Sequence, residues 1–494
     1  MANRNSTNNN SGNNGGKALP VVETITSYDW RHYLKSHPLC KGVPPWCFEH
    51  VPLHKEWQHI GVKGYKIEVA LTNEELPKYC DVQDENAVFW IANAVKYCGF
   101  MAKVVYDGSE HIPKTSRDQL SSRWINFVNE AKRVGYTTMH SYSIMPPKCM
   151  ETDKLEDFDW RDYIFNKLVQ KHSIPTIVTI NGELSAKYKS ELVVGQAVEV
   201  LDRACISRMR LGEVNQLVGG RVHVRYWDSK TEVGKADFVC HERSPTIFPC
   251  GWSRTVGQEI SAPTAYHSPI LKDSTLQYLI NYDNLPKISI SEGMKLESVD
   301  PLNPGVISAA TVKKVLKHGY FMATIDGQHS GVEKRKIAAF CYHLTSPLIF
   351  PCGYSEKRGI ELSLPKDYKG DPSKFAWDKY LEQTKSEALP IRGLRRDDTN
   401  SHGVKSGMKL EAVDIMEPHL MCVATVTRVI GRLLKVSFDG WGEEYDQWMD
   451  VKSPDLFPMG WCEVNRYPLQ HPPGTSKQPA STIIVSNGHN NNGH

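Results

Sequence analysis

A short phrase that recurs about every 100 residues constrains this chain more than any other feature. It reads SPTIFPCGW at 244–252, SPLIFPCGY at 346–354 and SPDLFPMGW at 453–461, and a degenerate copy, Gly135-Tyr136, stands where a first unit would end. Repetition at a fixed period indicates a chain built from copies of one structural unit. Because this period is too long for a solenoid repeat, each copy is expected to have its own small core and to pack on its neighbours.

A second phrase opens each of the four units. It reads GYKIEV from residue 64, GQAVEV from residue 195, GMKLESV from residue 293 and GMKLEAV from residue 407. Apolar and polar residues alternate in it, as in a half-buried strand. Further alternating runs follow the opening phrases, at 89–95, 222–226, 309–315, 422–429 and 433–438. We therefore predict a mainly β fold in which short strands close into a small barrel in each unit.

A third element precedes three of the units. It reads YDWRHYL from residue 28, FDWRDYI from residue 158 and FAWDKYL from residue 375, and STLQYLI from residue 274 takes its place in the third unit. Its spacing suits a short helix with tryptophan and leucine or isoleucine on one side, which we expect to dock onto a barrel. The predicted units are 28–140, 158–262, 271–370 and 375–473. The tails 1–20 and 474–494, rich in Asn, Ser and Gly, are predicted to be disordered.

The composition argues against several classes of function. A net charge of +3 is too small for affinity that comes mainly from neutralising phosphates. We expect no membrane span, because no apolar stretch of about 18 residues occurs, and no zinc site, because the 12 cysteines include no C-x-x-C. No nucleophile elbow, P-loop or dinucleotide fingerprint is present, so neither enzyme nor cofactor is expected. A catalytic pair of Cys240 and His241 is disfavoured because adjacent residues on a strand face opposite sides.

The fourth unit combines a tryptophan arm with GMKLEAVD, FDGWGEEYDQW and SPDLFPMGWC, and so resembles a malignant brain tumour (MBT) repeat. The resemblance covers about 28 to 473, is weakest in the first unit, and is similar to the four-repeat, lethal malignant brain tumour-like group. It implies a Tudor-like (SH3-like) barrel in each repeat, with a helical arm packed on a neighbouring repeat. It also implies a nuclear, Polycomb-related protein that binds mono- and dimethylated lysine on histone tails and acts with chromatin repressor proteins in transcriptional repression.

The resemblance also assigns site residues in the fourth unit. Phe438, Trp441 and Tyr445 match the family's aromatic cage, and Asp414 matches its carboxylate. A methylated ammonium is a cation with apolar methyls, so aromatic faces attract it. Mono- and dimethyllysine keep an N–H that can donate to a carboxylate, whereas trimethyllysine has none. Glu417 stands where many family members have Asn, and we expect it to add a second carboxylate to the site.

The other three units lack parts of this cage. The third keeps Asp300 and Asn303 but has Ile325 and Gln328 at aromatic positions, the second keeps Asp202 but has Ser229 and Val233, and the first has Ser109 for the tryptophan. Only the fourth unit is therefore predicted to hold a complete cage. We expect the remaining units to act as scaffold or as docking surface for proteins.

Two alternatives concern the aromatic residues of the fourth unit. Trp448 and Trp461 are interpreted as core residues rather than ligand-binding residues. Direct nucleic-acid binding is disfavoured because the nearby carboxylates would repel phosphate; these are Asp439, Glu443, Glu444, Asp446 and Asp450. A chromatin-complex scaffold that binds protein partners and carries a vestigial cage remains the alternative function.

Overall fold

The computed structural model describes most of the chain between residues 22 and 486. The described residues are 22–52, 54–60, 65–77, 87–109, 121–150, 188–232, 235–267, 290–327, 339–365, 368–390, 402–474 and 481–486. The arms expected from residues 158 and 274, together with Val233 and Gln328, lie outside them. Among the described residues, no helix has the length and apolar character needed to cross a membrane.

The strands form four similar, mainly antiparallel sheets, one in each predicted repeat, and in the first three a short strand pairs parallel with a long one. The first repeat contains β2 (Tyr65–Ala70), β3 (Val88–Cys98), β4 (Met101–Tyr106), β5 (Ser122–Asn126) and β6 (Ser143–Ile144), in the order β2-β3-β4-β5 with β6 beside β3. The second contains β7 (Ala197–Leu201), β8 (Met209–Val218), β9 (Arg221–Tyr226), β10 (Phe238–His241), β11 (Ile247–Pro249) and β12 (Ile260–Ser261), in the order β10-β9-β8-β7-β11 with β12 beside β8.

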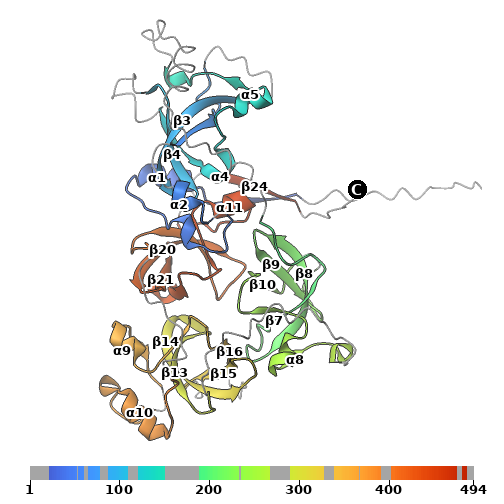
Figure 1. Cartoon of the computed structure of the whole chain (residues 1–494), viewed down its shortest axis with the longest axis vertical. Coiled ribbons are helices and arrows are strands. Elements are labelled where there is room, and N and C mark those ends of the chain that lie inside the picture. The colour runs from blue at the N-terminus through green and yellow to red at the C-terminus, as the bar shows by residue number, and fades with distance from the viewer. Residues whose placement is uncertain are drawn as a thin grey trace, which may run out of the picture.

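The third and fourth repeats follow the order of the second. The third contains β13 (Lys295–Asp300), β14 (Asn303–Val315), β15 (Tyr320–Ile325), β16 (Phe340–His343), β17 (Ile349–Phe350) and β18 (Leu362–Ser363). The fourth contains β19 (Lys409–Val413), β20 (Met421–Ile430), β21 (Leu433–Phe438), β22 (Gln447–Asp450) and β23 (Leu456–Phe457). Figure 1 shows that each sheet curls on itself. The prediction of a mainly β chain is confirmed.

A bulge at the same place in every repeat helps each sheet to curl. The second long strand shifts register against the next strand at 94–96, 214–216, 312–314 and 426–428. A bulge bends a strand and increases its twist, which a small sheet needs in order to close on itself. Short helices fill the connections; they are η1 (Pro45–Cys47), α2 (Trp57–Ile60), α4 (Phe127–Glu130), η3 (Lys148–Met150), η5 (Thr264–His267), η8 (Pro372–Lys374) and η10 (Glu443–Tyr445).

A short closing helix follows the glycine–aromatic phrase of each repeat. The closing helices are α5 (Tyr136–His140), α8 (Trp252–Val256), α9 (Tyr354–Arg358) and α11 (Trp461–Asn465). Each begins after a glycine with positive φ, at 83° to 93°, and has no side-chain cap of its own. The orphan N–H groups at a helix start need acceptors from elsewhere.

The buried glutamate of the opening phrase supplies those acceptors in every repeat. In the fourth, the carboxylate of Glu411 accepts from Gly460 N and Cys462 N, both at 2.7 Å. In the third, Glu297 accepts from Gly353 N at 2.7 Å and Ser355 N at 2.8 Å. Glu68 and Glu199 bind the equivalent N–H groups of their own repeats. The opening phrase of each repeat thus supplies the acceptor of this contact, and the glycine–aromatic phrase supplies the N–H donors.

The two described arms dock on this same glutamate. Arm helix α10 (Trp377–Thr384) packs on the third repeat, where Trp377 Nε1 donates to Glu297 at 2.8 Å. Arm helix α1 (Trp30–Ser36) packs on the fourth repeat, where Trp30 Nε1 donates to Glu411 at 2.8 Å. The N-terminal arm therefore binds the last repeat of the chain, and Figure 1 shows the first and fourth repeats side by side. The prediction that an arm docks on a barrel is confirmed for both helices.

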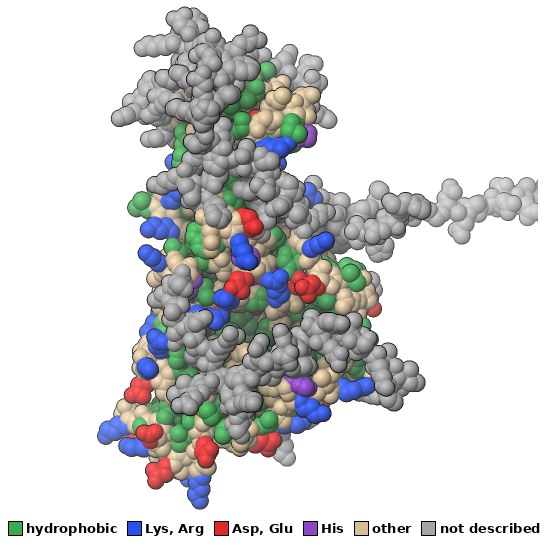
Figure 2. All heavy atoms as spheres, in the orientation of Figure 1, with side chains coloured by type: hydrophobic (Ala, Val, Ile, Leu, Met, Phe, Trp, Pro, Cys, Tyr) green, Lys and Arg blue, Asp and Glu red, His purple; other side chains and the backbone are tan. Residues whose placement is uncertain are grey.

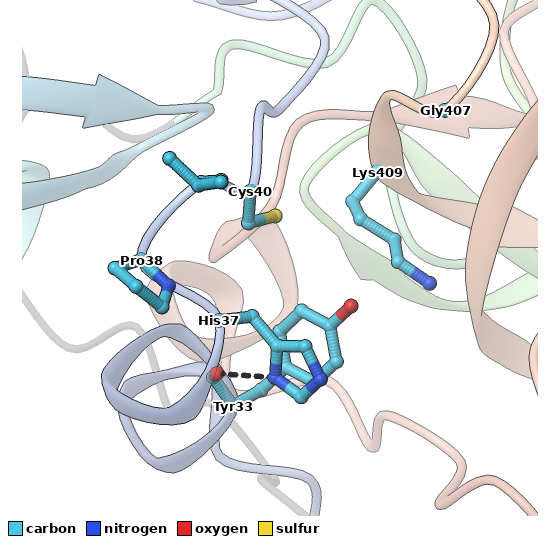
Figure 3. Close-up of a pocket in the computed structure, with 7 residues that line it drawn as sticks. Tyr33, His37, Pro38, Cys40, Gly407 and Lys409 are labelled. Carbon is cyan, nitrogen blue, oxygen red and sulfur yellow. Dashed lines mark hydrogen bonds between the residues drawn. The ribbon is translucent and has the colours of Figure 1, made fainter.

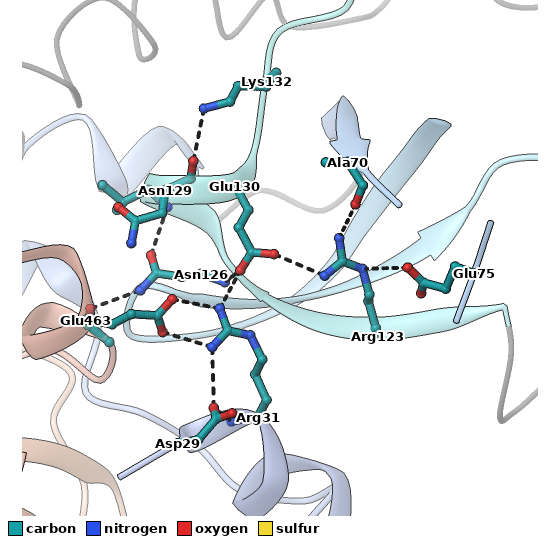
Figure 4. A network of polar contacts seen from close by, with 12 residues as sticks. Asp29, Arg31, Ala70, Glu75, Arg123, Asn126, Asn129, Glu130, Lys132 and Glu463 are labelled. Carbon is teal, nitrogen blue, oxygen red and sulfur yellow. Dashed lines mark hydrogen bonds and ion pairs between the residues drawn. The ribbon is translucent and has the colours of Figure 1, made fainter. Parts of the chain in front are cut away.

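An ion-pair network reinforces the contact between the first and fourth repeats. Arg31 pairs with Glu463 of α11 at 2.7 Å and with Glu130 of α4, which in turn accepts from Arg123 at 3.0 Å. Asn126 Nδ2 donates to Gly460 O at 3.0 Å across the same boundary (Figure 4). The cores of these two repeats form one continuous apolar cluster.

Closing helices also join the second, third and fourth repeats in a cycle. Trp252 of α8 lies edge-on to Tyr320 of the third repeat's hairpin at 5.1 Å. Tyr354 of α9 packs with Leu433 of the fourth repeat's hairpin. Trp461 of α11 approaches Gly219 of the second repeat's hairpin so closely that a Cβ there would lie 2.7 Å from the indole. Figure 1 shows these three repeats grouped together.

A polar junction lies where the first, second and fourth repeats meet. His50 and His241 stack edge-to-face at 4.9 Å, and both rings contact Phe457. Burial, together with the positive charges of nearby Arg243 and Arg221, lowers the pKa of His50 to about 3 and that of His241 to about 2. Both histidines are therefore neutral in the folded chain.

The C-terminal segment differs from the expectation. Residues Ser481–Ser486 form β24, which pairs antiparallel with β1 (Val22–Ser27), although 474–494 was predicted to be disordered. The reason is local composition. Both segments alternate or repeat β-branched residues, which favour strands, within a region otherwise rich in Asn, Ser and Gly.

Replacing Glu411 with Ala is expected to destabilise the chain strongly. The change leaves two backbone N–H groups and the Trp30 indole N–H buried without an acceptor, which costs roughly 3 kcal/mol or more in free energy of unfolding. Thermal unfolding followed by circular dichroism checks this, with exposed Glu213→Ala as the control. An unchanged midpoint for Glu411→Ala would show that the contact is dispensable.

Acidification is expected to weaken the junction. Because the buried histidines stay neutral while an unfolded histidine gains a proton below about pH 6.5, the free energy of unfolding should fall between about pH 6.5 and pH 4. The drop in unfolding midpoint between about pH 7.5 and about pH 5 should shrink in His241→Gln. It should persist in His32→Gln, which alters an exposed histidine. Equal drops in both variants contradict the assignment.

Candidate functional site

The predicted site residues of the fourth repeat lie on three neighbouring segments. Asp414 and Glu417 follow β19, Phe438 is the last residue of β21, and Trp441 and Tyr445 lie between β21 and β22. Trp441 and Tyr445 pack edge-to-face with ring centroids 5.3 Å apart. Their side chains are 45% and 48% exposed. Two large aromatic rings are therefore held together at the surface of the fourth repeat.

Phe438 lies deeper than the other two rings of the predicted cage. It is only 3% exposed and belongs to the core shared by the first and fourth repeats. The reason is its place at the end of β21, where it pairs with Ala424 and faces inward. Trp448 and Trp461 are buried, as predicted.

Gln447 ties the Asp414 loop to the aromatic segment. Its Nε2 donates to Asp414 Oδ1 at 2.7 Å, and its Oε1 accepts from Ile415 N at 3.0 Å. Asp414 also accepts from Met416 N at 2.9 Å, which closes a turn on the carboxylate. Because Gln447 begins β22, two residues after Tyr445, it links the Asp414 loop to the segment that carries the rings. The sequence analysis did not assign this residue, since nothing in the linear spacing links position 447 to 414.

Cys422 lies close to Asp414 on the inner side of β20. Burial, together with the negative charge of Asp414, raises the pKa of the Cys422 thiol to about 12. On the same strand, Ala424 stands opposite Phe438, and residues two apart on a strand share a face. A small side chain thus occupies the wall between the carboxylate and the buried ring.

Strand register identifies what stands at the Cys422 position in the other repeats. The residue after the buried glutamate pairs with Cys422 in the fourth repeat, and its counterparts pair with Trp90 in the first, Arg210 in the second and Ser308 in the third. Trp90 is buried and fills the first repeat. Leu71 takes the place of Asp414 there, so the first repeat also lacks the carboxylate.

In the second repeat, Arg210 is engaged with acidic and aromatic side chains of the same repeat. Its guanidinium lies over the Tyr226 ring at 4.5 Å and binds Asp228 at 2.6 Å. The buried Asp202 is paired with Arg208 at 2.8 Å and lies 3.6 Å from Arg210. The carboxylate and ring that correspond to Asp414 and Phe438 already hold a cation from the same repeat.

In the third repeat, the carboxylate remains but the aromatic side is missing. Asp300 accepts from Leu302 N at 2.8 Å, and Asn303 begins β14. Ile325 replaces Phe438, and Ser229 and Ser109 hold the Trp441 position in the second and first repeats. Among the described residues, the fourth repeat therefore has both a carboxylate at this position and exposed rings on the β21–β22 connection.

Glu417 lies close to two basic side chains, Arg203 and His419. Its carboxylate lies 3.5 Å from Arg203 Nη2 and 3.6 Å from His419 Nδ1, and about half of the side chain is exposed. The expectation that it contributes to cation binding stays a prediction.

The acidic rim expected around the site is smaller than predicted. Asp439 pairs with Lys409, Asp450 with Arg432 at 2.6 Å, and Asp446 is buried. Only Glu443 and Glu444 of the five carboxylates are exposed. Cross-strand partners, invisible in the linear sequence, neutralise the others. On the face drawn in Figure 2, basic and acidic side chains are interspersed.

A separate pocket of about 330 Å³ lies between the N-terminal arm and β19. It is lined by Tyr33, His37, Pro38, Leu39, Cys40, Gly407 and Lys409 (Figure 3). None of the predicted site residues borders it. Among the described residues, no group of three or more potential ligand side chains could hold a metal ion.

Comparison with known proteins defines the class of this chain. A family model described as mbt repeat matches residues 196–267, 294–369 and 408–476. MBT domain-containing protein 1 of Xenopus laevis is 36% identical over 470 residues, which cover 93% of this chain and 70% of that protein. The chain therefore belongs to the MBT-repeat family.

Two further similarities come from the fruit fly. Polycomb protein Sfmbt of Drosophila melanogaster is 36% identical over 481 residues, which cover 93% of this chain and 37% of that protein. The crystal structure of its four MBT repeats, in complex with a peptide RHR(me)KVLR, matches with a TM-score of 0.75 and 34% identity over 91% of this chain and 99% of that one. The expected arrangement of four MBT repeats is confirmed.

Replacing Gln447 with Ala is expected to loosen the Asp414 loop while the barrel stays folded. The change removes an acceptor from Ile415 N and a donor from Asp414, at a cost of roughly 1–2 kcal/mol. Hydrogen–deuterium exchange of peptides covering 414–420 should become faster. Gln196→Ala, which removes a comparable contact to Val193 N in the second repeat, is the control. Unchanged exchange at 414–420 would count against this role of Gln447.

Proposed function

We propose that the chain is a nuclear chromatin reader whose fourth repeat binds mono- and dimethylated lysine on histone tails. The observation that carries this proposal is the hydrogen bond that ties Asp414 to Gln447, two residues after Tyr445, in the repeat whose Trp441 and Tyr445 rings pack together and are half exposed. Membership of the MBT-repeat family and the methylated peptide bound to the Sfmbt repeats support it. The Polycomb relative further supports a role in transcriptional repression with other chromatin repressor proteins.

The chemistry of the proposed site suits a cation with apolar methyls. The rings of Phe438, Trp441 and Tyr445 would attract the methylated ammonium by cation–π interaction, each contributing about 0.5–2 kcal/mol. The Asp414 carboxylate would accept the N–H that mono- and dimethyllysine retain, which trimethyllysine lacks. Glu417 would stand at the rim and add negative charge there. This is binding chemistry, and we propose no catalytic role.

Arg210, Trp90 and Ile325 support restriction of binding to the fourth repeat. Arg210 in the second repeat and Trp90 in the first stand at the position of Cys422. Ile325 in the third repeat stands at the position of Phe438. A ligand cation at the second repeat would have to displace Arg210 from two carboxylates and a ring. We propose that these repeats hold the fourth in place and leave surfaces for partner proteins rather than nucleic acid.

Calorimetric titration of the full chain with histone peptides that are unmodified, mono-, di- or trimethylated at one lysine tests the proposal. Binding should be weak, with Kd in the tens of micromolar or above, because a small recess makes few contacts. Trp441→Ala and Asp414→Asn should each lower the affinity for dimethyllysine by roughly tenfold or more. Melting should stay near that of the unaltered chain.

Ser229→Ala and Ser109→Ala are the matched controls, because they alter the Trp441 position in the second and first repeats. Both should bind like the unaltered chain. Retained affinity in Trp441→Ala would place the reader site in another repeat. Absence of methyl-dependent binding in the unaltered chain would instead favour the alternative function, a scaffold of a chromatin complex whose cage is vestigial.

A further inference from the structure

We propose that the second repeat positions the Asp414 loop through Arg203 and Arg221. This inference rests on the proposed function, because it assigns a positioning role at the same site. The loop, defined as residues 414–420, connects β19 to β20 and carries the carboxylate. Both arginines come from the second repeat, about 200 residues earlier in the chain, and neither is assigned to the cage.

Arg203 holds the middle of the loop. Its Nη2 donates to Met416 O at 3.0 Å and lies 3.5 Å from the Glu417 carboxylate. Arg203 immediately follows Asp202, so the two repeats bring equivalent loops face to face. Because both side chains of the ion pair are largely exposed, the bond to the backbone carbonyl is the contact that fixes the loop.

Arg221 holds the end of the loop. Its side chain is fully buried, its Nη2 donates to Pro418 O, and its guanidinium lies over the Tyr467 ring at 5.5 Å. Tyr467 Oη in turn donates to His419 O at 3.4 Å. Asp455 of the fourth repeat lies 3.8 Å from Arg221 and balances its charge. Three backbone carbonyls of the loop are therefore bound from the side that faces the second repeat.

The opposite end of the loop is bound from within the fourth repeat. Gln447 binds both Asp414 and Ile415 N, so the loop is held at its start by its own barrel and beyond it by the second repeat. Trp441 and Tyr445 lie on the β21–β22 connection. The hydrogen bonds and ion pairs of Arg203 and Arg221 go to other segments of the fourth repeat. A shift of the loop would therefore move the carboxylate relative to the rings.

Such a shift would change the preference among methylation states more than the stability of the fold. A hydrogen bond from the ligand N–H to Asp414 depends on distance and angle within a few tenths of an ångström. Attraction of the cation to the rings has no such requirement and acts equally on trimethyllysine. A loosened loop should consequently lose the preference for mono- and dimethyllysine while retaining part of the affinity.

The test compares Arg203→Ala with the unaltered full chain by calorimetric titration with mono-, di- and trimethyllysine peptides. We expect the affinity for dimethyllysine to fall roughly threefold to tenfold and its ratio to the affinity for trimethyllysine to approach one. Hydrogen–deuterium exchange of the loop should become faster in the absence of peptide. Arg203→Lys, which can still donate to Met416 O, should restore the unaltered preference.

Arg243→Ala is the matched control. Arg243 is also an arginine of the second repeat that reaches another repeat, where its Nη1 donates to Glu49 O at 3.3 Å, and it does not contact the loop. It should leave exchange and peptide preference unchanged. Glu417→Gln separates the two roles considered for that residue. Lower affinity with unchanged loop exchange would indicate direct contact with the cation.

The two proposals fail in distinguishable ways. If the unaltered chain discriminates among methylation states and Arg203→Ala does so equally, the positioning role is overturned and the reader function stands. If the unaltered chain binds no methylated peptide, the reader function fails, and loop exchange in Arg203→Ala still decides whether the second repeat holds the loop. Unchanged exchange overturns the positioning role in either case.

Discussion

The four repeats depend on a buried carboxylate that accepts the first N–H groups of a closing helix. Burying an anion is costly unless donors surround it, and here the backbone itself supplies two of them. Glu297 and Glu411 each accept a third bond from the tryptophan of an arm, and Glu199 accepts one from Tyr266 Oη at 2.5 Å. One side chain thus fixes the opening strand, the closing helix and the neighbouring repeat relative to one another. Its position in the middle of each barrel explains why the phrases around it survive repetition.

One strand position carries a different side chain in each repeat. Cys422 is small and buried near Asp414, whereas Arg210 supplies an internal cation at the equivalent place and Trp90 places a buried indole there. None of these changes disturbs the contact between the buried glutamate and the closing helix. The residues of the predicted site are therefore different from those of the folding contact, so a unit can keep its architecture without the full set of predicted cage residues.

Much of the fold was predictable because strand alternation and repetition are local properties of the sequence. The opening phrases and the runs at 222–226 and 433–438 indicate strands that the structure contains. What could not be predicted depends on contacts across long separations. Trp30 was expected to dock on a barrel, yet nothing in its phrase identifies Glu411, 381 residues away, as its partner. From the sequence alone, Asp450 would be interpreted as a surface charge, whereas the structure pairs it with Arg432 across the hairpin.

The candidate site divides in the same way. The resemblance pointed to Phe438, Trp441 and Tyr445, and the last two are half exposed. The burial of Phe438 was not predicted, because it depends on the strand register that places it opposite Ala424. Gln447 and Cys422 carry no signal in a single sequence, since an ordinary glutamine and an ordinary cysteine acquire their roles only through strand register.

The cyclic packing of the second, third and fourth repeats has a consequence for rigidity. Each contact is small: a few apolar side chains and one or two hydrogen bonds at a hairpin. In a linear array, such contacts would open independently. In a closed cycle, any contact that opens is still held by the other two, so its partners remain at high effective concentration and rejoin before they can separate. Three small interfaces arranged in a cycle can in this way keep the relative positions of the three repeats constant.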